Sequence, residues 1–270
     1  MLKAVVFDVE GTLLDSIQHR ALAWRDALRE FGTNVEPADL TPYVAGPERE
    51  VPRRFMEPAV LAEVTADRVI ERYHDAWESA HSANVQPIPQ GRPLVEALRD
   101  RGLSVALATR AHESRLMDLV KRADLVGLVE AAGIPEGPTH SPTPGKPSEG
   151  PTDGDEGRDA EDLSEREVLA AAQALVDSTP EETLAVVHGA SDARAAKALG
   201  MRVVALLSGG IERSALESAG AEHIFASPEE MLMNLADLAP LGFPTTRGEA
   251  PRSPATTYDG PTDDGDGRNS

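Results

Sequence analysis

Residues 4–16 constrain the fold of this chain more than any other segment. They begin with an apolar run at 4–7, place one carboxylate at Asp8 and a second at Glu10, and then reach Gly11. Such a run before a turn signal is typical of a buried parallel strand. Because open α/β sheets bind ligands at the carboxyl ends of their strands, both acids are expected to face one cleft.

The spacing of the two acids suits a transfer reaction that passes through a covalent intermediate. Asp8 at the strand end can attack phosphorus as a nucleophile, and Glu10 can carry a proton in the same cleft. Gly11 allows the chain to turn sharply away from the strand. The simpler alternative is a strand that ends in two solvated acids and a glycine turn.

Helices and strands are expected to alternate along much of the chain. Within residues 17–83, apolar side chains recur at helical spacing. Trp24 and Trp77 among them are expected to pack these helices together, with substrate contact as the alternative. Further helices are expected at 93–101, 113–122 and 164–176, and strands at 104–108, 184–187, 203–207 and 223–225. This order predicts an α/β fold with a parallel sheet covered on both faces.

Two segments have the composition of disordered chain. Residues 137–163 and 238–270 are rich in proline, glycine and acidic residues, and they carry few apolar side chains to bury. We expect the first to be an acidic low-complexity insertion and the second a disordered acidic tail.

The charge balance limits the partners of the chain. The formal net charge is −20 and only four lysines occur, so nucleic acid and anionic membranes are expected to be repelled. No stretch is apolar enough to span a bilayer, no signal peptide is evident, and a cytoplasmic location is expected. The absence of cysteine excludes disulfides and thiolate metal sites. Excess acid with few lysines resembles halophilic proteins, although the two acidic segments alone offer another explanation.

The Asp-x-Glu-Gly-Thr sequence at 8–12 resembles motif I of the haloacid dehalogenase-like (HAD) superfamily, which normally reads Asp-x-Asp-Gly-Thr. Glu10 takes the second Asp position, as in the enolase-phosphatases of that superfamily. The resemblance implies a Rossmann-like core formed by residues 1–16 and 84–237, with a small helical cap at 17–83. It also implies Mg²⁺-dependent hydrolysis of a small phosphorylated metabolite through an aspartyl-phosphate.

Two further motifs of the superfamily have counterparts here. Thr109 follows the strand expected at 104–108, as motif II requires, and Lys146 stands in a Gly-Lys-Pro sequence, as in motif III. The resemblance assigns Thr109, Arg110 and Lys146 to binding of the phosphoryl group. A lysine there would offset the repulsion between the nucleophile and the phosphate. Lys146 lies inside the low-complexity segment, so a linker lysine is the alternative.

Motif IV departs from the superfamily pattern. Its usual Gly-Asp-Ser-x-x-Asp becomes Gly-Ala-Ser-Asp at 189–192, so Ala190 replaces the first acid. The resemblance implies that Asp8, the backbone carbonyl of Glu10 and Asp192 hold Mg²⁺. Asp192 has three open roles: a metal ligand, the holder of a metal-bound water, or a helix cap. His188, which precedes this motif, is expected to be packed or half-exposed, with a ligand role as the less favoured alternative.

The residues and the resemblance together predict an enzyme in which Asp8, Glu10, Thr109 and Lys146 carry the chemistry. The alternative is a catalytically impaired member of the superfamily that binds a phosphorylated ligand or a protein partner. Glu10 and Ala190 are the two departures that favour this alternative. The sequence leaves the specific substrate and the oligomeric state open.

Overall fold

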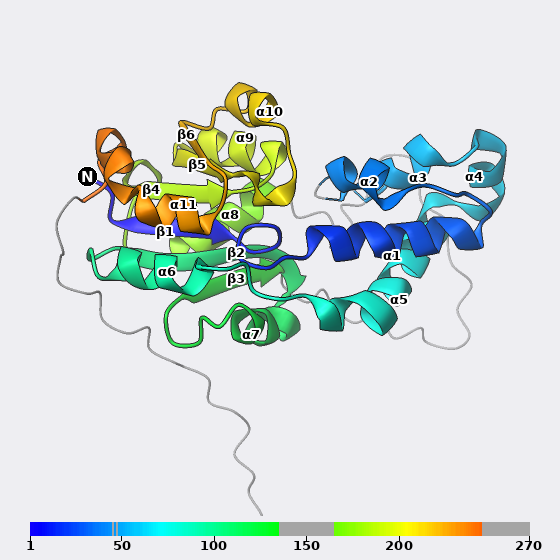
Figure 1. Cartoon of the computed structure of the whole chain (residues 1–270), viewed down its shortest axis with the longest axis horizontal. Helices are drawn as coiled ribbons and strands as arrows, with labels where there is room; N and C mark the ends of the chain where they lie inside the picture. The colour runs from blue at the N-terminus through cyan, green and yellow to red at the C-terminus, as the bar shows by residue number, and fades with distance from the viewer. Residues whose placement is uncertain (45, 47, 135–164, 245–270) are drawn as a thin grey trace, which may run out of the picture.

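A six-stranded parallel sheet forms the centre of the protein, with β1 between β2 and β4 (Figure 1). The computed structural model describes residues 1–44, 46, 48–134 and 165–244. The strand order is β3-β2-β1-β4-β5-β6. The strands are β1 (Ala4–Asp8), β2 (Ser104–His112), β3 (Glu130–Ile134), β4 (Thr183–Val187), β5 (Arg202–Leu206) and β6 (His223–Phe225). The predicted α/β class is confirmed.

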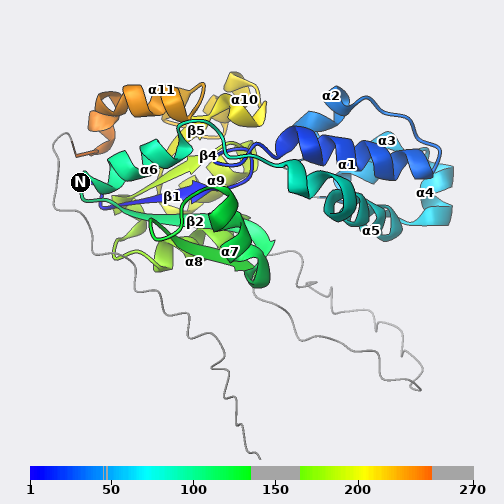
Figure 2. The same cartoon turned by 60° about the horizontal axis from the view of Figure 1, so that its bottom comes forward.

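Helices cover both faces of this sheet (Figures 1 and 2). They are α6 (Gly91–Arg99), α7 (Glu113–Arg122), α8 (Glu165–Ala174), α9 (Ala190–Leu199), α10 (Arg213–Ser218) and α11 (Pro228–Met233), with 3₁₀ turns η4 (Pro180–Glu182), η5 (Leu207–Gly209) and η6 (Leu235–Leu241). Side chains alternate along β1: Val5 and Phe7 join the apolar cluster under α6 and α11, and Val6 joins the one under α8 and α9. A strand buried on both faces explains the continuous apolar run.

A separate group of helices is formed by the residues that come between β1 and α6 in the sequence. It extends from one end of the sheet (Figure 1). It comprises α1 (Ile17–Glu30), α2 (Pro37–Leu40), η1 (Thr41–Tyr43), α3 (Glu50–Phe55), α4 (Pro58–Val64), α5 (Ala66–Ala76), η2 (Trp77–His81) and η3 (Ser82–Asn84). These helices enclose an apolar cluster of their own. At its centre, Trp24 of α1 stacks on Tyr73 of α5 with ring centroids 4.1 Å apart.

Several boundaries differ from those that the sequence predicts. Edge strand β3 was not expected, because its Glu-Ala-Ala-Gly-Ile sequence lacks a run of branched or aromatic residues. Strand β2 continues to His112 beyond the expected end at 108. Residues 238–244 are ordered, which corrects the start of the predicted disordered tail: Leu238 and Phe243 are buried in the main cluster. The rest of that tail and the insertion at 137–163 lie outside the described residues.

None of the helices in the described part of the chain is both long and apolar enough to cross a membrane.

Candidate active site at the carboxyl edge of the sheet

Asp8 is the last residue of β1, and its carboxylate is largely enclosed at this edge. Its Oδ1 accepts a hydrogen bond from the Val9 amide at 2.8 Å, and its Oδ2 accepts one from the Thr12 hydroxyl at 3.2 Å. Its side chain is 15% exposed. The loop after β1 therefore fixes the carboxylate while leaving it within reach of a ligand.

His188 contacts the same carboxylate from the neighbouring strand. It follows β4, and its Nδ1 bonds to Oδ2 of Asp8. The ring lies between two glycines: a Cβ at Gly11 would come within 2.7 Å of Cδ2, and a Cβ at Gly209 would meet the same atom. Gly11 also has a positive φ of 75°. Both glycines thus leave room for an imidazole on the nucleophile candidate, beyond the turn that the sequence predicts for Gly11.

The electrostatic environment of His188 favours its protonated form. Burial alone would lower the pKa of His188, but the Asp8 carboxylate, with Asp192 and Glu10, raises it above the ordinary histidine value. The residue is only 5% exposed, and its Nε2 has no hydrogen-bond partner among the described residues. His188 is packed, as expected, but it packs directly on Asp8.

Glu10 is held from two sides at this edge. The Thr109 hydroxyl lies 3.2 and 3.0 Å from its two carboxylate oxygens, and the Arg20 guanidinium lies 3.2 Å from Oε1. Thr109 belongs to the sheet, whereas Arg20 belongs to the first turns of α1. The carboxylate that the sequence predicts to transfer a proton therefore joins the sheet to the helical group.

The predicted phosphate-binding residues are only partly described. Thr109 is buried, and it lies where the β2–β3 register shifts after Ala108. The sequence predicts Thr109 at the end of this strand, but β2 continues past the irregularity to His112, so Thr109 lies within it. Arg110 is in β2, but its side chain lies outside the described part of the structure, as does all of Lys146.

Asp192 lies in the first turn of α9, close to Asp8. One ligand atom each from Asp8, His188 and Asp192 lie within 4.8 Å of one another. Ala190, which begins α9, has no side-chain donor. Two carboxylates and one imidazole fit a divalent cation: the oxygens suit Mg²⁺ and Mn²⁺, and the nitrogen is a donor that Mn²⁺ accepts more readily than Mg²⁺ does.

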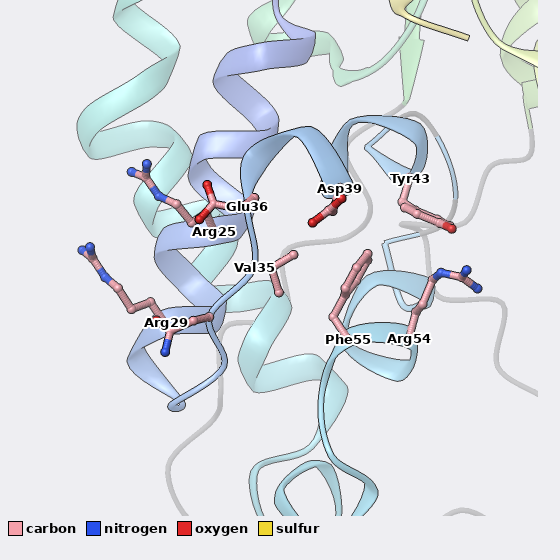
Figure 3. A pocket seen from close by; sticks show the side chains of 9 residues that line it. Arg25, Arg29, Val35, Glu36, Asp39, Tyr43, Arg54 and Phe55 are labelled. Atoms are coloured by element: carbon pink, nitrogen blue, oxygen red, sulfur yellow. The ribbon is translucent and has the colours of Figure 1, made fainter. Parts of the chain in front are cut away.

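A hollow of about 860 Å³ opens elsewhere, among α1, α2 and α3 (Figure 3). Arg25, Arg29 and Arg54 line it together with Glu36 and Asp39, so its charge is mixed. None of the residues gathered around Asp8 lines it. The side chains that the sequence predicts to carry the chemistry, as far as the structure describes them, lie instead at the carboxyl edge of the sheet, together with the cluster of Asp8, His188 and Asp192.

Comparison with known proteins identifies the family. The model of the haloacid dehalogenase-like hydrolases matches residues 2–200. The chain belongs to this family. It is 26% identical over 151 residues to a phosphoglycolate phosphatase of Aquifex aeolicus, which covers 53% of this chain and 67% of that protein. A phosphoglycolate phosphatase of Pseudomonas putida is 26% identical over 217 residues, with 77% and 70% covered.

Solved structures share the fold at low identity. A predicted phosphatase from Clostridium acetobutylicum superposes with a TM-score of 0.69 at 18% identity, over 88% of this chain and 100% of the other. A haloacid dehalogenase-like hydrolase from Streptococcus pneumoniae gives a TM-score of 0.68 at 17% identity, over 87% and 98%. These solved structures share the arrangement of the sheet and helices with this chain.

The contacts of two residues at this edge, Arg20 and His188, were not predicted from the sequence. Arg20 carried a signal, because it lies three residues after Ile17 and four before Trp24, on the buried side of α1. A charge on that face requires a buried partner. His188 interrupts an otherwise apolar strand end, and the pairing of Phe7 with Val186 brings the ends of β1 and β4 together. Only the sheet order reveals that Asp8 is the neighbour.

Proposed function

We propose that this protein is a phosphatase that hydrolyses small phosphate monoesters through an aspartyl-phosphate on Asp8. One observation carries the proposal: Asp8 and Glu10 lie together at the carboxyl edge of β1, where Thr12 of the same loop fixes Asp8 and Thr109 of β2 fixes Glu10. A nucleophile and a proton carrier in one place are what phosphoryl transfer to a carboxylate requires. The family and the curated relatives support the same reaction class.

Each residue has a step in this reaction. An oxygen of Asp8 attacks phosphorus as the ester oxygen departs, and Glu10 gives that oxygen its proton. Glu10 then takes a proton from water, which attacks the aspartyl-phosphate and releases inorganic phosphate. Thr109, Arg110 and Lys146 are proposed to hold the phosphoryl oxygens. The Thr109 hydroxyl now donates to Glu10, so donating to phosphate requires it to turn.

A divalent cation would be held by Asp8 and Asp192, together with the Glu10 carbonyl. His188 would add its nitrogen only after losing the proton that Asp8 favours. Mg²⁺ is the family's expected ion. When bound, it would neutralise charge between the nucleophile and the phosphoryl oxygens. The helices at 17–84 are proposed to act as a cap that determines which esters enter.

The test is a screen of phosphate monoesters with Mg²⁺ and with Mn²⁺, at low and molar KCl. It begins with 2-phosphoglycolate, because the two relatives named above are phosphoglycolate phosphatases. Turnover with a phosphorylated Asp8 trapped by acid quench and located by mass spectrometry supports the proposal. Turnover without that adduct, and undiminished in Asp8→Asn, would contradict the mechanism.

The contact between His188 and Asp8 favours a second candidate. With Thr12 and His188 on Oδ2 and the Val9 amide on Oδ1, both oxygens of Asp8 are engaged. A protein that binds a phosphorylated ligand without turnover would tolerate this arrangement. Calorimetry that shows binding of a phosphate monoester, with no hydrolysis in the presence of Mg²⁺ or Mn²⁺, would favour this binding function over the phosphatase.

A further inference from the structure

Arg20 connects three parts of the protein through one side chain. Its guanidinium contacts Glu10 in the core loop, donates to the Tyr73 hydroxyl of α5 at 2.8 Å, and lies 4.7 Å from the ring centre of Trp77 in η2. Its own backbone is in α1. The contact therefore joins the loop after β1 to α1, α5 and η2 of the helical group.

The support beneath Arg20 is rigid. Tyr73 is 1% exposed and stacks on the equally buried Trp24 with ring planes 7° apart. Burial alone would lower the pKa of Arg20, but Tyr73 and the Glu10 carboxylate outweigh burial and raise the pKa above its ordinary value. The side chain therefore stays charged. A planar cation that bonds to the Tyr73 hydroxyl and lies over the Trp77 ring has little freedom to follow a moving carboxylate.

Glu10 depends on this support because a free glutamate side chain samples many rotamers. Fixing one such side chain costs conformational entropy, which its partners must offset. Here Thr109 fixes the carboxylate from the sheet and Arg20 fixes it from the helical group. A proton carrier must lie within hydrogen-bond reach of the ester oxygen, so an unsupported Glu10 would often be misplaced.

We propose that Arg20 is a positioning residue that sets Glu10 for protonation of the leaving group and ties this setting to the placement of α1 and α5. This inference rests on the proposed phosphatase function. It makes proton delivery depend on the helical group: when the two helices shift, the guanidinium shifts with them and Glu10 loses one of its two supports.

The leaving group provides a readout that a purely structural role would not move. An alkoxide needs a proton as it departs, whereas p-nitrophenolate does not. The value of kcat/KM reports steps up to the first irreversible one, which here is ester cleavage. A series from p-nitrophenyl phosphate to alkyl phosphates, led by the best alkyl substrate of the screen, therefore isolates the protonation by Glu10.

We expect Arg20→Met and Arg20→Lys to lower kcat/KM for alkyl phosphates by about 10- to 100-fold, and for p-nitrophenyl phosphate by less than about 3-fold, since general acid catalysis is worth 10²–10⁴. Tyr73→Phe removes only the hydroxyl anchor and should act in the same direction more weakly. If Arg20→Met fails to fold, Arg20→Lys and Tyr73→Phe carry the test.

A control and a double mutant separate positioning from other roles. Arg72 lies on the same helix as Tyr73 but pairs with Glu30 at the surface, so Arg72→Gln should leave the alkyl-to-aryl ratio unchanged. In a Glu10→Gln background, Arg20→Lys should add no further leaving-group effect, because the group it positions is gone.

The outcomes distinguish this inference from the function beneath it. Equal losses for all esters, a loss confined to KM, or no loss would overturn the role of Arg20 while leaving the phosphatase intact. A folded wild-type protein that hydrolyses none of the esters, or an Asp8→Asn protein that still turns over, would refute the proposed function, and the inference would fail with it.

Discussion

The ends of β1 and β4 lie next to each other in the sheet, yet they differ in how closely they follow the family. The β1 end keeps a nucleophile candidate, a proton carrier and a glycine turn at 8–11. The β4 end loses an acid at Ala190 and brings His188 onto Asp8. The groups proposed for covalent chemistry thus follow the family pattern, whereas the groups proposed to hold a metal ion depart from it.

The largest expected effect tests the β1 end. Asp8→Asn should lower kcat by several orders of magnitude, because an amide cannot form the phosphoryl adduct and the covalent route is lost. Steady-state kinetics on the best ester of the screen measure this loss, and a thermal melt checks folding. An Asp8→Asn protein with near wild-type kcat would show that Asp8 is not the nucleophile.

The next effect tests the β4 end. Wild type should bind Mg²⁺ in the millimolar range, about −4 kcal/mol, because one carboxylate of the usual site is missing. Asp192→Ala should abolish the calorimetric signal, and Ala190→Asp should tighten binding if position 190 faces the ion. Inorganic phosphate should strengthen binding to wild type.

A matched control for this titration is Asp67→Ala, since Asp67 is also an acid in the first turn of a helix but pairs with Arg49 on the helical group. It should bind Mg²⁺ as wild type does. Unchanged binding in Asp192→Ala would leave Asp192 as a helix cap or a second-sphere group. No binding to wild type, even with phosphate, would favour the non-catalytic candidate.

The same contrast explains what the sequence could predict. The apolar run of β1 and the two acids after it are local signals, and the structure has them where expected. The contact of His188 with Asp8 depends on pairing between residues 180 positions apart. Edge strand β3 and the bridge from Arg20 to Glu10 likewise depend on tertiary neighbours. Roles for Lys146 and Arg110 remain predictions.

A smaller effect tests the His188–Asp8 contact. The folded-state pKa of His188 is raised, so the contact contributes stability below the ordinary histidine pKa of about 6.5, and this contribution is lost as the pH rises through the folded value. In metal-free protein, the melting temperature of wild type should exceed that of His188→Asn most at acidic pH. The gap between the two melting temperatures should narrow by about 3–12 °C as the pH rises, because a charged hydrogen bond of about 1.5–3 kcal/mol is lost.

Packing lost in His188→Asn gives an offset that does not depend on pH, so only the change in the gap is informative. Differential scanning calorimetry from pH 5.5 to 9 with a chelator present measures it. A gap that is constant across this range, or that widens with pH, would mean that the imidazole is neutral on Asp8 and that the β4 end adds no cation to the site.

The smallest effect separates local from global electrostatics. With a net charge of −20, self-repulsion should be screened by molar KCl, and the melting temperature of wild type should rise by roughly 2–4 °C for each 1 kcal/mol recovered. His188→Asn should show the same rise at neutral pH, because a buried contact is screened far less than surface charge. A flat or falling melting temperature in both proteins would assign the acid excess to the segments at 137–163 and beyond 244. A rise in wild type alone would mean that the β4 end, and not the surface, responds to salt.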